Sequence, residues 1–102
     1  MNSYPGFSLS LCMNNKIILE SLASDLKRVA LGIHRGSFSM AERFSDEALK
    51  RKQEVNMQLN AGYITRLLNQ LETLLSSSDS MQKAENALMY STLLQNYAQK
   101  LA

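Results

Sequence analysis

The sequence has little of what marks a disulfide-stabilised, zinc-binding or β-rich protein. It contains one cysteine, one histidine and one proline, and tryptophan is absent. The lone Cys12 excludes a disulfide within the chain and any cysteine-rich zinc site, and it suits a reducing cytoplasm. Pro5 lies outside every periodic segment, and β-branched residues are sparse after residue 34, which disfavours strands. These shortages predict an all-α protein.

Length and charge indicate a single domain without a strongly charged partner. The 102 residues fit one domain, and the net charge of +2 is too small to require a polyanion. Residues 27–52 are mildly basic, with seven Lys/Arg against three Asp/Glu. No uncharged apolar stretch approaches a membrane span, and the start of the chain lacks the basic residues of a signal peptide. We therefore expect a cytoplasmic protein without membrane contact.

The beginning of the chain differs from the rest. Residues 1–13 show no helical period and include the turn signal Pro5-Gly6, so we expect a flexible leader, followed by a single helical domain over 14–102. Arg35-Gly36 predicts the end of a first helix over 14–34, since glycine adopts the left-handed conformation of a helix stop. Apolar residues recur in this helix at spacings of three and four: Ile18, Leu22, Leu26, Val29 and Ile33.

A second helix is expected to begin at Ser39, because Ser39 and Glu42 match a capping box. We expect it to continue to about Leu75, since no proline interrupts it and the lone Gly62 costs only about 1 kcal/mol. A break near Gly62 is the alternative. The second half of this segment carries the most apolar stripe of the chain: Ile64, Leu67, Leu68, Leu71, Leu74 and Leu75.

The last helix is predicted over 81–101, after the serine-rich linker 76–80. Asp79 lies three residues before Gln82 and predicts an N-terminal cap. Two apolar stripes run along this helix: Ala84, Leu88, Leu94, Ala98 and Leu101 in one, and Tyr90, Leu93 and Tyr97 in the other. The sequence thus predicts a small antiparallel bundle of three long helices, or four if the middle one breaks near Gly62, completed by dimerisation.

Motifs for catalysis and for cofactor or metal binding are missing from the sequence. The glycines are isolated, so they form no phosphate-binding loop, and one histidine cannot supply the usual zinc ligands. The adjacent carboxylates of Asp46 and Glu47 diverge on a helix, which makes them a poor acid–base pair. We expect neither a cofactor nor a metal.

One local pattern favours a different function. Arg28 and His34 are separated by five residues, and this spacing resembles the R-x(4–6)-H signature of HEPN-type helical ribonucleases. The resemblance implies that the arginine and histidine act on an RNA phosphodiester, usually across a dimer interface. It covers seven residues, and Val29 stands where the family has a polar residue. The structural alternative is a solvated Arg28 and a His34 that interacts with the helix macrodipole.

The preferred prediction is a non-catalytic adaptor or regulator that acts through apolar helix faces. It rests on the apolar stripes of the last two segments, which few helices can bury, so we expect a homodimer that also binds another protein. The residues expected to bind the partner are Leu67, Leu71, Leu74, Tyr90, Leu93 and Tyr97. The alternative is a HEPN-like ribonuclease or a nucleic-acid-binding module that uses Arg28 and His34.

Overall fold

The computed structural model describes residues 7–55 and 62–101, with side chains from residue 15 onward. Helices account for nearly all of this part of the chain, and strands are absent from it, which confirms the all-α prediction. The elements are α1 (Phe7–His34), α2 (Phe38–Glu54), α3 (Gly62–Leu75) and α4 (Ser80–Gln99).

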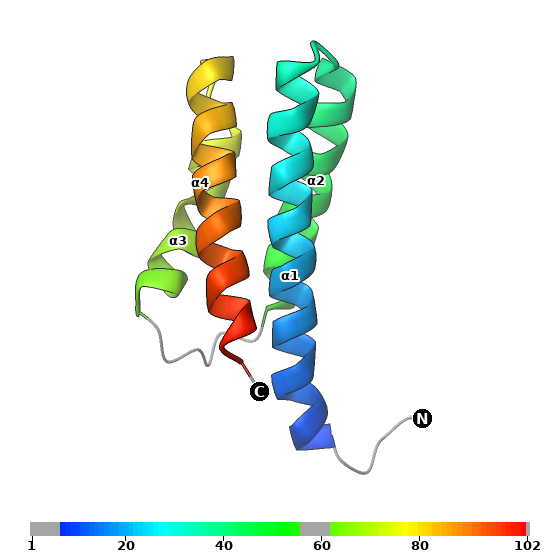
Figure 1. Cartoon of the computed structure of the whole chain (residues 1–102), viewed down its shortest axis with the longest axis vertical. Helices are drawn as coiled ribbons and strands as arrows, with labels where there is room; N and C mark the ends of the chain where they lie inside the picture. Colours follow the sequence, from blue (N-terminus) through cyan, green and yellow to red (C-terminus); the bar gives the residue numbers. More distant parts are fainter. Residues whose placement is uncertain (1–6, 56–61, 102) are drawn as a thin grey trace.

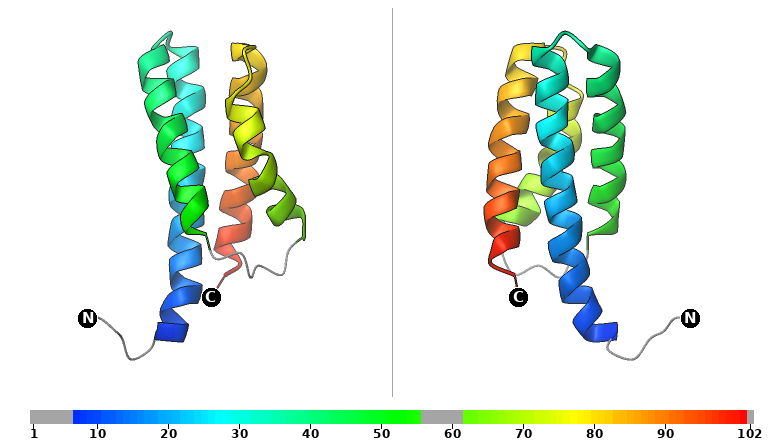
Figure 2. Two further views of the ribbon diagram at one scale, coloured as in Figure 1. Left: turned by 180° about the vertical axis from the view of Figure 1, so that it is seen from behind. Right: turned by 45° about the vertical axis from the view of Figure 1, so that its right-hand side comes forward.

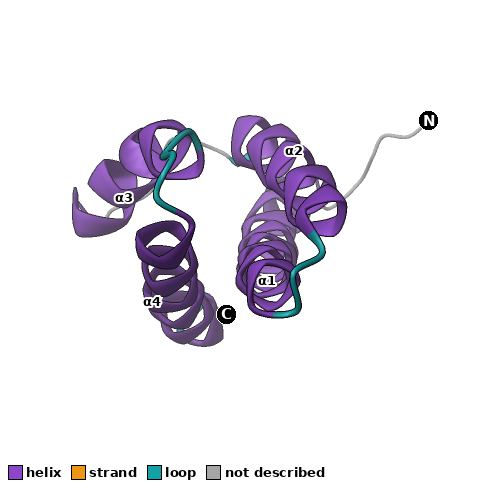
Figure 3. Cartoon of the chain, turned by 90° about the horizontal axis from the view of Figure 1, so that it is seen from above, coloured by secondary structure: helices purple, strands orange, loops and turns teal. Residues whose placement is uncertain are grey.

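The helices alternate in direction along the chain (Figure 1). Viewed along the bundle, they follow one another around a ring, so that α1 has α2 and α4 as neighbours and α3 stands opposite α1 (Figure 3). The first turns of α1 extend beyond the ends of α2 and α4 (Figures 1 and 2). The described chain measures 46 × 29 × 19 Å along its principal axes.

The expected continuous helix from Ser39 to Leu75 is wrong. The α2 helix ends at Glu54, and Val55 has extended backbone with φ −68° and ψ 131°. The N–H of Val55 donates to the carbonyl of Lys52 in a turn, and the side chain of Val55 is buried in the core. The chain therefore leaves the helical conformation at this point. Gly62 is the first residue of α3, and residues 56–61 lie outside the described residues.

Two helix starts also differ from those expected. The α1 helix begins at Phe7 instead of 14, so residues 7–13 of the expected leader are helical, and residues 1–6 lie outside the described part. Ser37, rather than Ser39, is the N-cap of α2, and its side chain makes no capping hydrogen bond. Ser37 is the N-cap because its carbonyl accepts the first hydrogen bond of α2, from Ala41 N–H at 3.1 Å.

The turn between α1 and α2 follows the prediction for Gly36, which has φ +74°. The N–H of Ser37 donates to the carbonyl of Gly32 at 2.8 Å, and that of Gly36 donates to Ile33 at 3.1 Å. These two bonds form a Schellman motif, which satisfies carbonyls at the end of α1. Gly32 also permits close packing, because a Cβ there would lie 2.9 Å from the backbone nitrogen of Ala41.

The core consists of aliphatic side chains from all four helices. The largest of those with essentially no exposed surface are Leu19, Leu22, Leu26, Val29, Ile64, Leu68, Leu71 and Leu94. Burial of a leucine side chain contributes about 1.5–3 kcal/mol. The stripe expected for the first helix is confirmed as core except that Ile18 is only partly buried, and the leucine stripe of α3 is confirmed in full.

The interface between α1 and α4 is built from small side chains. Ala23 and Ala30 of α1 are buried, and the buried face of α4 consists of Ala84, Ala87, Ser91, Leu94 and Ala98. Small residues let two helices approach closely, and the hydroxyl of Ser91 accordingly donates to the backbone carbonyl of Ala23 at 2.7 Å. The predicted cap by Asp79 is confirmed, since its carboxylate accepts from Gln82 N–H at 3.1 Å and fixes the start of α4.

Candidate functional site

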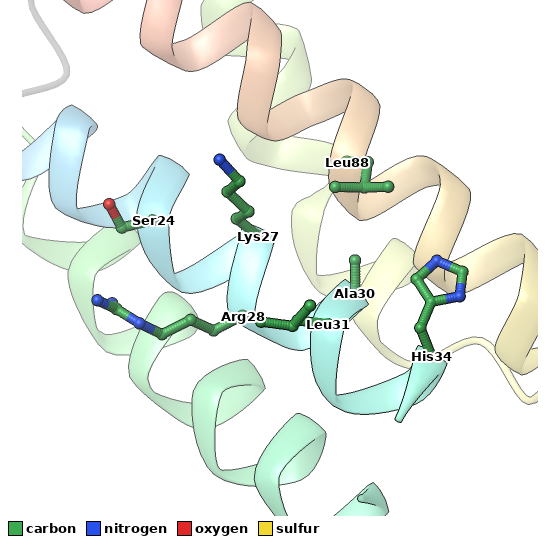
Figure 4. Close-up of a pocket in the computed structure, with 7 residues that line it drawn as sticks. All are labelled: Ser24, Lys27, Arg28, Ala30, Leu31, His34 and Leu88. Carbon is green, nitrogen blue, oxygen red and sulfur yellow. The ribbon is translucent and has the colours of Figure 1, made fainter. Parts of the chain in front are cut away.

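A groove runs along the outer side of the α1–α4 interface. It comprises two adjoining hollows of about 350 and 370 Å³, and Ser24, Lys27 and Leu88 line both of them. We call this continuous feature the α1/α4 groove. Its other lining residues are Arg28, Ala30, Leu31 and His34 at one end, and Ala23, Ser91, Thr92, Gln95 and Asn96 at the other. Figure 4 shows the residues of the first end.

The first end of the groove is apolar. Leu31 on α1 and Leu88 on α4 are each 40% exposed, and the buried Ala30 lies between the two helices (Figure 4). The sequence places Leu88 in an apolar stripe of the last helix, but the small side chains of the interface already fill the contact between α1 and α4. Large side chains beside this contact consequently remain at the surface. Scattered exposed leucines are ordinary, whereas these two line one hollow, which makes the hollow a candidate binding surface.

The other side of α1 is fixed by a half-buried ionic contact, in which the carboxylate is buried and the arginine is partly exposed. Asp25 is only 3% exposed, and its Oδ2 accepts a hydrogen bond from Nε of Arg51 on α2 at 3.0 Å. The second carboxylate oxygen lies 3.7 Å from Nη1 of Arg28. Burial raises the pKa of Asp25 above its ordinary value of 3.8, while the bond from Arg51 and the two positive charges oppose that rise.

This contact replaces one expected from the sequence. Arg51 lies four residues after Glu47, a spacing that predicts a surface pair within α2. It instead pairs with Asp25, and Glu47 lies 4.0 Å from Lys50. The sequence pattern places Asp25 away from the centre of the apolar stripe, and it does not reveal the burial because the partner is 26 residues away in the chain.

Arg28 and His34 line the same hollow but point in different directions. Arg28 extends towards α2, whereas His34 extends towards α4 (Figure 4). The guanidinium of Arg28 lies 5.4 Å from the ring centre of Phe44 and also faces the carboxylate of Asp25. Within one chain, the two side chains therefore do not converge on a common point where an RNA phosphodiester could be held by both.

The residues expected to bind a partner divide into two groups. Leu67, Leu71 and Leu74 are buried in the core of the chain itself, so they are not available on its surface. Tyr90, Leu93 and Tyr97 lie on α4, where the two tyrosines are half-buried and only Leu93 is exposed, at 38%.

Both tyrosines contact α3. The hydroxyl of Tyr90 donates to Oε1 of Gln70 at 3.1 Å, and the ring of Tyr97 lies edge-on to that of Tyr63, 6.2 Å between centres. The second apolar stripe of α4 is thus used mainly within the chain. The α1/α4 groove, by contrast, was not predicted as a site apart from Arg28 and His34, the residues of the alternative function. The signal available was the spacing of Lys27, Leu31 and His34, which share one face of a helix.

The described residues hold no group of three or more His, Cys, Asp and Glu side chains placed to bind a metal ion. Across the same part of the chain, none of the helices is both long and apolar enough to cross a membrane.

Comparison with known proteins adds no assignment. No family model matches this chain, and neither the curated proteins nor the solved structures give a significant match. The class that the fold and the groove define is therefore a helical bundle with a surface groove between its first and last helices.

Proposed function

We propose that this protein is a non-catalytic interaction or regulatory module that binds another protein through the α1/α4 groove. The observation that carries the proposal is the pair of exposed leucines, Leu31 and Leu88, which line one hollow above a packed interface. An amphipathic helix that lies in a groove uses this kind of surface, with its apolar residues anchored between the two walls.

The burial of the α3 leucines removes one reason for expecting a homodimer. Those leucines motivate dimerisation at the level of sequence, but one chain already provides the helices that cover them. Homodimerisation stays a prediction, as does a cytoplasmic location, and light scattering of the purified chain tests the first. If copies do associate, we expect them to do so through Leu31 and Leu88, because these are the exposed leucines of the groove.

A matched pair of variants on α4 tests the proposal. Leu88 and Leu93 are the same residue type, on the same helix and exposed to 40% and 38%, but only Leu88 lines the groove. Tagged wild type, Leu88→Asp and Leu93→Asp are purified from the native host, and the bound proteins are quantified by mass spectrometry. Circular dichroism melting establishes that both variants are folded.

We expect a stoichiometric partner that Leu88→Asp loses and Leu93→Asp retains. Equal recovery with all three proteins would contradict the use of the groove. Loss with Leu93→Asp alone would move the binding surface to the face of Tyr90, Leu93 and Tyr97.

A further inference from the structure

The charges that line the α1/α4 groove are of one sign. Its titratable lining residues are Lys27, Arg28 and His34, and no carboxylate lines either hollow. The guanidinium of Arg28 is turned away towards Asp25 and Phe44, so the groove itself presents Lys27 and His34.

Lys27 forms no ion pair within the described residues, unlike Arg28 beside it in the groove lining. Arg28 and Arg51 lie against Asp25, and Lys50 lies against Glu47. Its side chain extends towards α4 at the point where the two hollows meet (Figure 4). A cation placed there attracts an acidic group of any partner that enters the groove.

The two basic residues flank the apolar wall along α1. Lys27 precedes Leu31 by four residues, and His34 follows it by three, so each lies about one turn away, roughly 4.5–6 Å along the axis. The imidazole of His34 carries an N–H that can donate to a carboxylate, and Lys27 donates through its ammonium. A complementary surface has apolar residues at its centre with carboxylates one turn away.

We infer that the occupant of the α1/α4 groove is an acidic amphipathic helix of another protein. Its leucine-like residues pack against Leu31 and Leu88, and an Asp or Glu one turn away faces Lys27. This inference rests on the proposed function and adds the chemistry of the partner. It also predicts that binding weakens as salt is raised, because Lys27 is exposed.

A selection from helical peptides tests the inference and does not require an identified partner. A display library with one randomised helix face is selected against the full-length protein. The recovered peptides are then titrated against wild type, Lys27→Glu, Leu88→Asp and Leu93→Asp. Arg66→Glu serves as the charge control, because Arg66 is an exposed cation on α3 that does not line the groove. Light scattering follows the oligomeric state of each protein.

The expected peptides combine leucines with Asp or Glu and lose at least about tenfold in affinity with Lys27→Glu and with Leu88→Asp. Leu93→Asp and Arg66→Glu leave their affinity within about twofold, an effect typical of charges and side chains outside an interface.

Other outcomes overturn the inference in distinguishable ways. Peptides that need Leu88 but are neutral or basic, and that ignore Lys27→Glu, refute the acidic partner and leave the groove as a binding site. A wild-type dimer that Leu88→Asp dissociates makes a second copy of the chain the occupant instead. Peptides that bind all variants equally, or no peptides at all, count against the proposed function as well.

Discussion

Arg51 donates a hydrogen bond from Nε to the buried carboxylate of Asp25 at 3.0 Å, and this half-buried bond joins α2 to α1. It holds the two helices in register on the side of α1 that faces away from the groove. Asp25 and Arg51 therefore help to position the α1 wall of the groove, although neither residue lines the groove.

Asp25 should make the stability of the protein fall as pH rises through the acid range. Burial raises the folded-state pKa above the ordinary 3.8, so the unfolded chain releases this proton at lower pH than the folded chain does. The free energy of unfolding then decreases from about pH 3.8 up to the folded pKa, at no more than about 1.4 kcal/mol per pH unit for a single group.

Urea unfolding of wild type and Asp25→Asn between about pH 3.5 and 7 isolates this effect, because carboxyl groups in proteins titrate mainly within this range. We expect the advantage of wild type over Asp25→Asn to be larger at the acid end. Asp46→Asn is the control, because Asp46 is an exposed carboxylate on α2 that lies outside the buried contact. A wild-type advantage that grows with pH would show that Arg51 outweighs burial.

Removal of Arg51 should cost more than removal of its neighbour Lys50. Arg51→Met leaves the carboxylate of Asp25 buried, with only the longer contact to Arg28, and we expect a loss of about 1–3 kcal/mol at pH 7. Lys50 has a 73% exposed side chain and pairs with Glu47 at 4.0 Å, so Lys50→Met should change stability by less than about 0.5 kcal/mol. Chemical denaturation measures both, and equal effects would mean that the buried contact contributes no more than a surface pair.

Gly32 and Gly62 should respond in opposite ways to alanine. At Gly32 a Cβ would lie 2.9 Å from the backbone nitrogen of Ala41, so Gly32→Ala should destabilise by about 1–3 kcal/mol despite the better helix propensity of alanine. At Gly62 a Cβ would meet nothing within 4 Å, and Gly62→Ala should be neutral or stabilise by up to about 1 kcal/mol. Thermal unfolding separates the two, and a stable Gly32→Ala would mean that α1 and α2 are not so closely packed.

Ser91 should be sensitive to size more than to the loss of its hydroxyl. Ser91→Ala removes the bond to the Ala23 carbonyl and should cost about 0.5–1.5 kcal/mol. Ser91→Leu should cost about 1–3 kcal/mol or more, because a large side chain forces α1 and α4 apart. Thr92→Ala is the control, since the hydroxyl of Thr92 bonds to Leu88 within its own helix and is exposed. If Ser91→Leu were as stable as Ser91→Ala, the close approach of α1 and α4 would be in doubt.

Leu71 should behave as a core residue and not as a contact between copies. It is fully buried, so Leu71→Ala should destabilise by about 2–5 kcal/mol, whereas Leu88→Ala should cost less than about 1 kcal/mol. Urea midpoints are measured at several protein concentrations. If the stability loss caused by Leu71→Ala depended on protein concentration, Leu71 would lie in a dimer interface, as the leucine stripe of the sequence suggests.

The sequence predicted the features that depend on neighbouring residues. Helical class, the left-handed Gly36 and the cap by Asp79 are all determined by short stretches of chain. The end of α2 before Val55 was not predictable in this way, because no glycine or proline precedes it and burial of Val55 depends on the rest of the fold.

The candidate site was harder to predict for a related reason. The apolar stripe predicted for the last helix contains Leu88 together with Ala84, Leu94 and Ala98, but the structure buries only these three and leaves Leu88 40% exposed. Small residues give a weak periodic signal, and the pairing of Asp25 with Arg51 depends on helices that are distant in sequence. Hydrophobic periodicity therefore identified the helices but did not predict which faces of α1 and α4 are exposed.

The alanines and the serine between α1 and α4 also determine how the groove can respond to a ligand. Alanine has no side-chain rotamers to lose, and the single χ angle of Ser91 is held by its bond to Ala23. The floor of the groove is consequently preorganised, so the proposed binding would order only the side chains of its walls. A helix bound there as proposed would meet a fixed backbone surface, and we expect the groove to select for one helix shape.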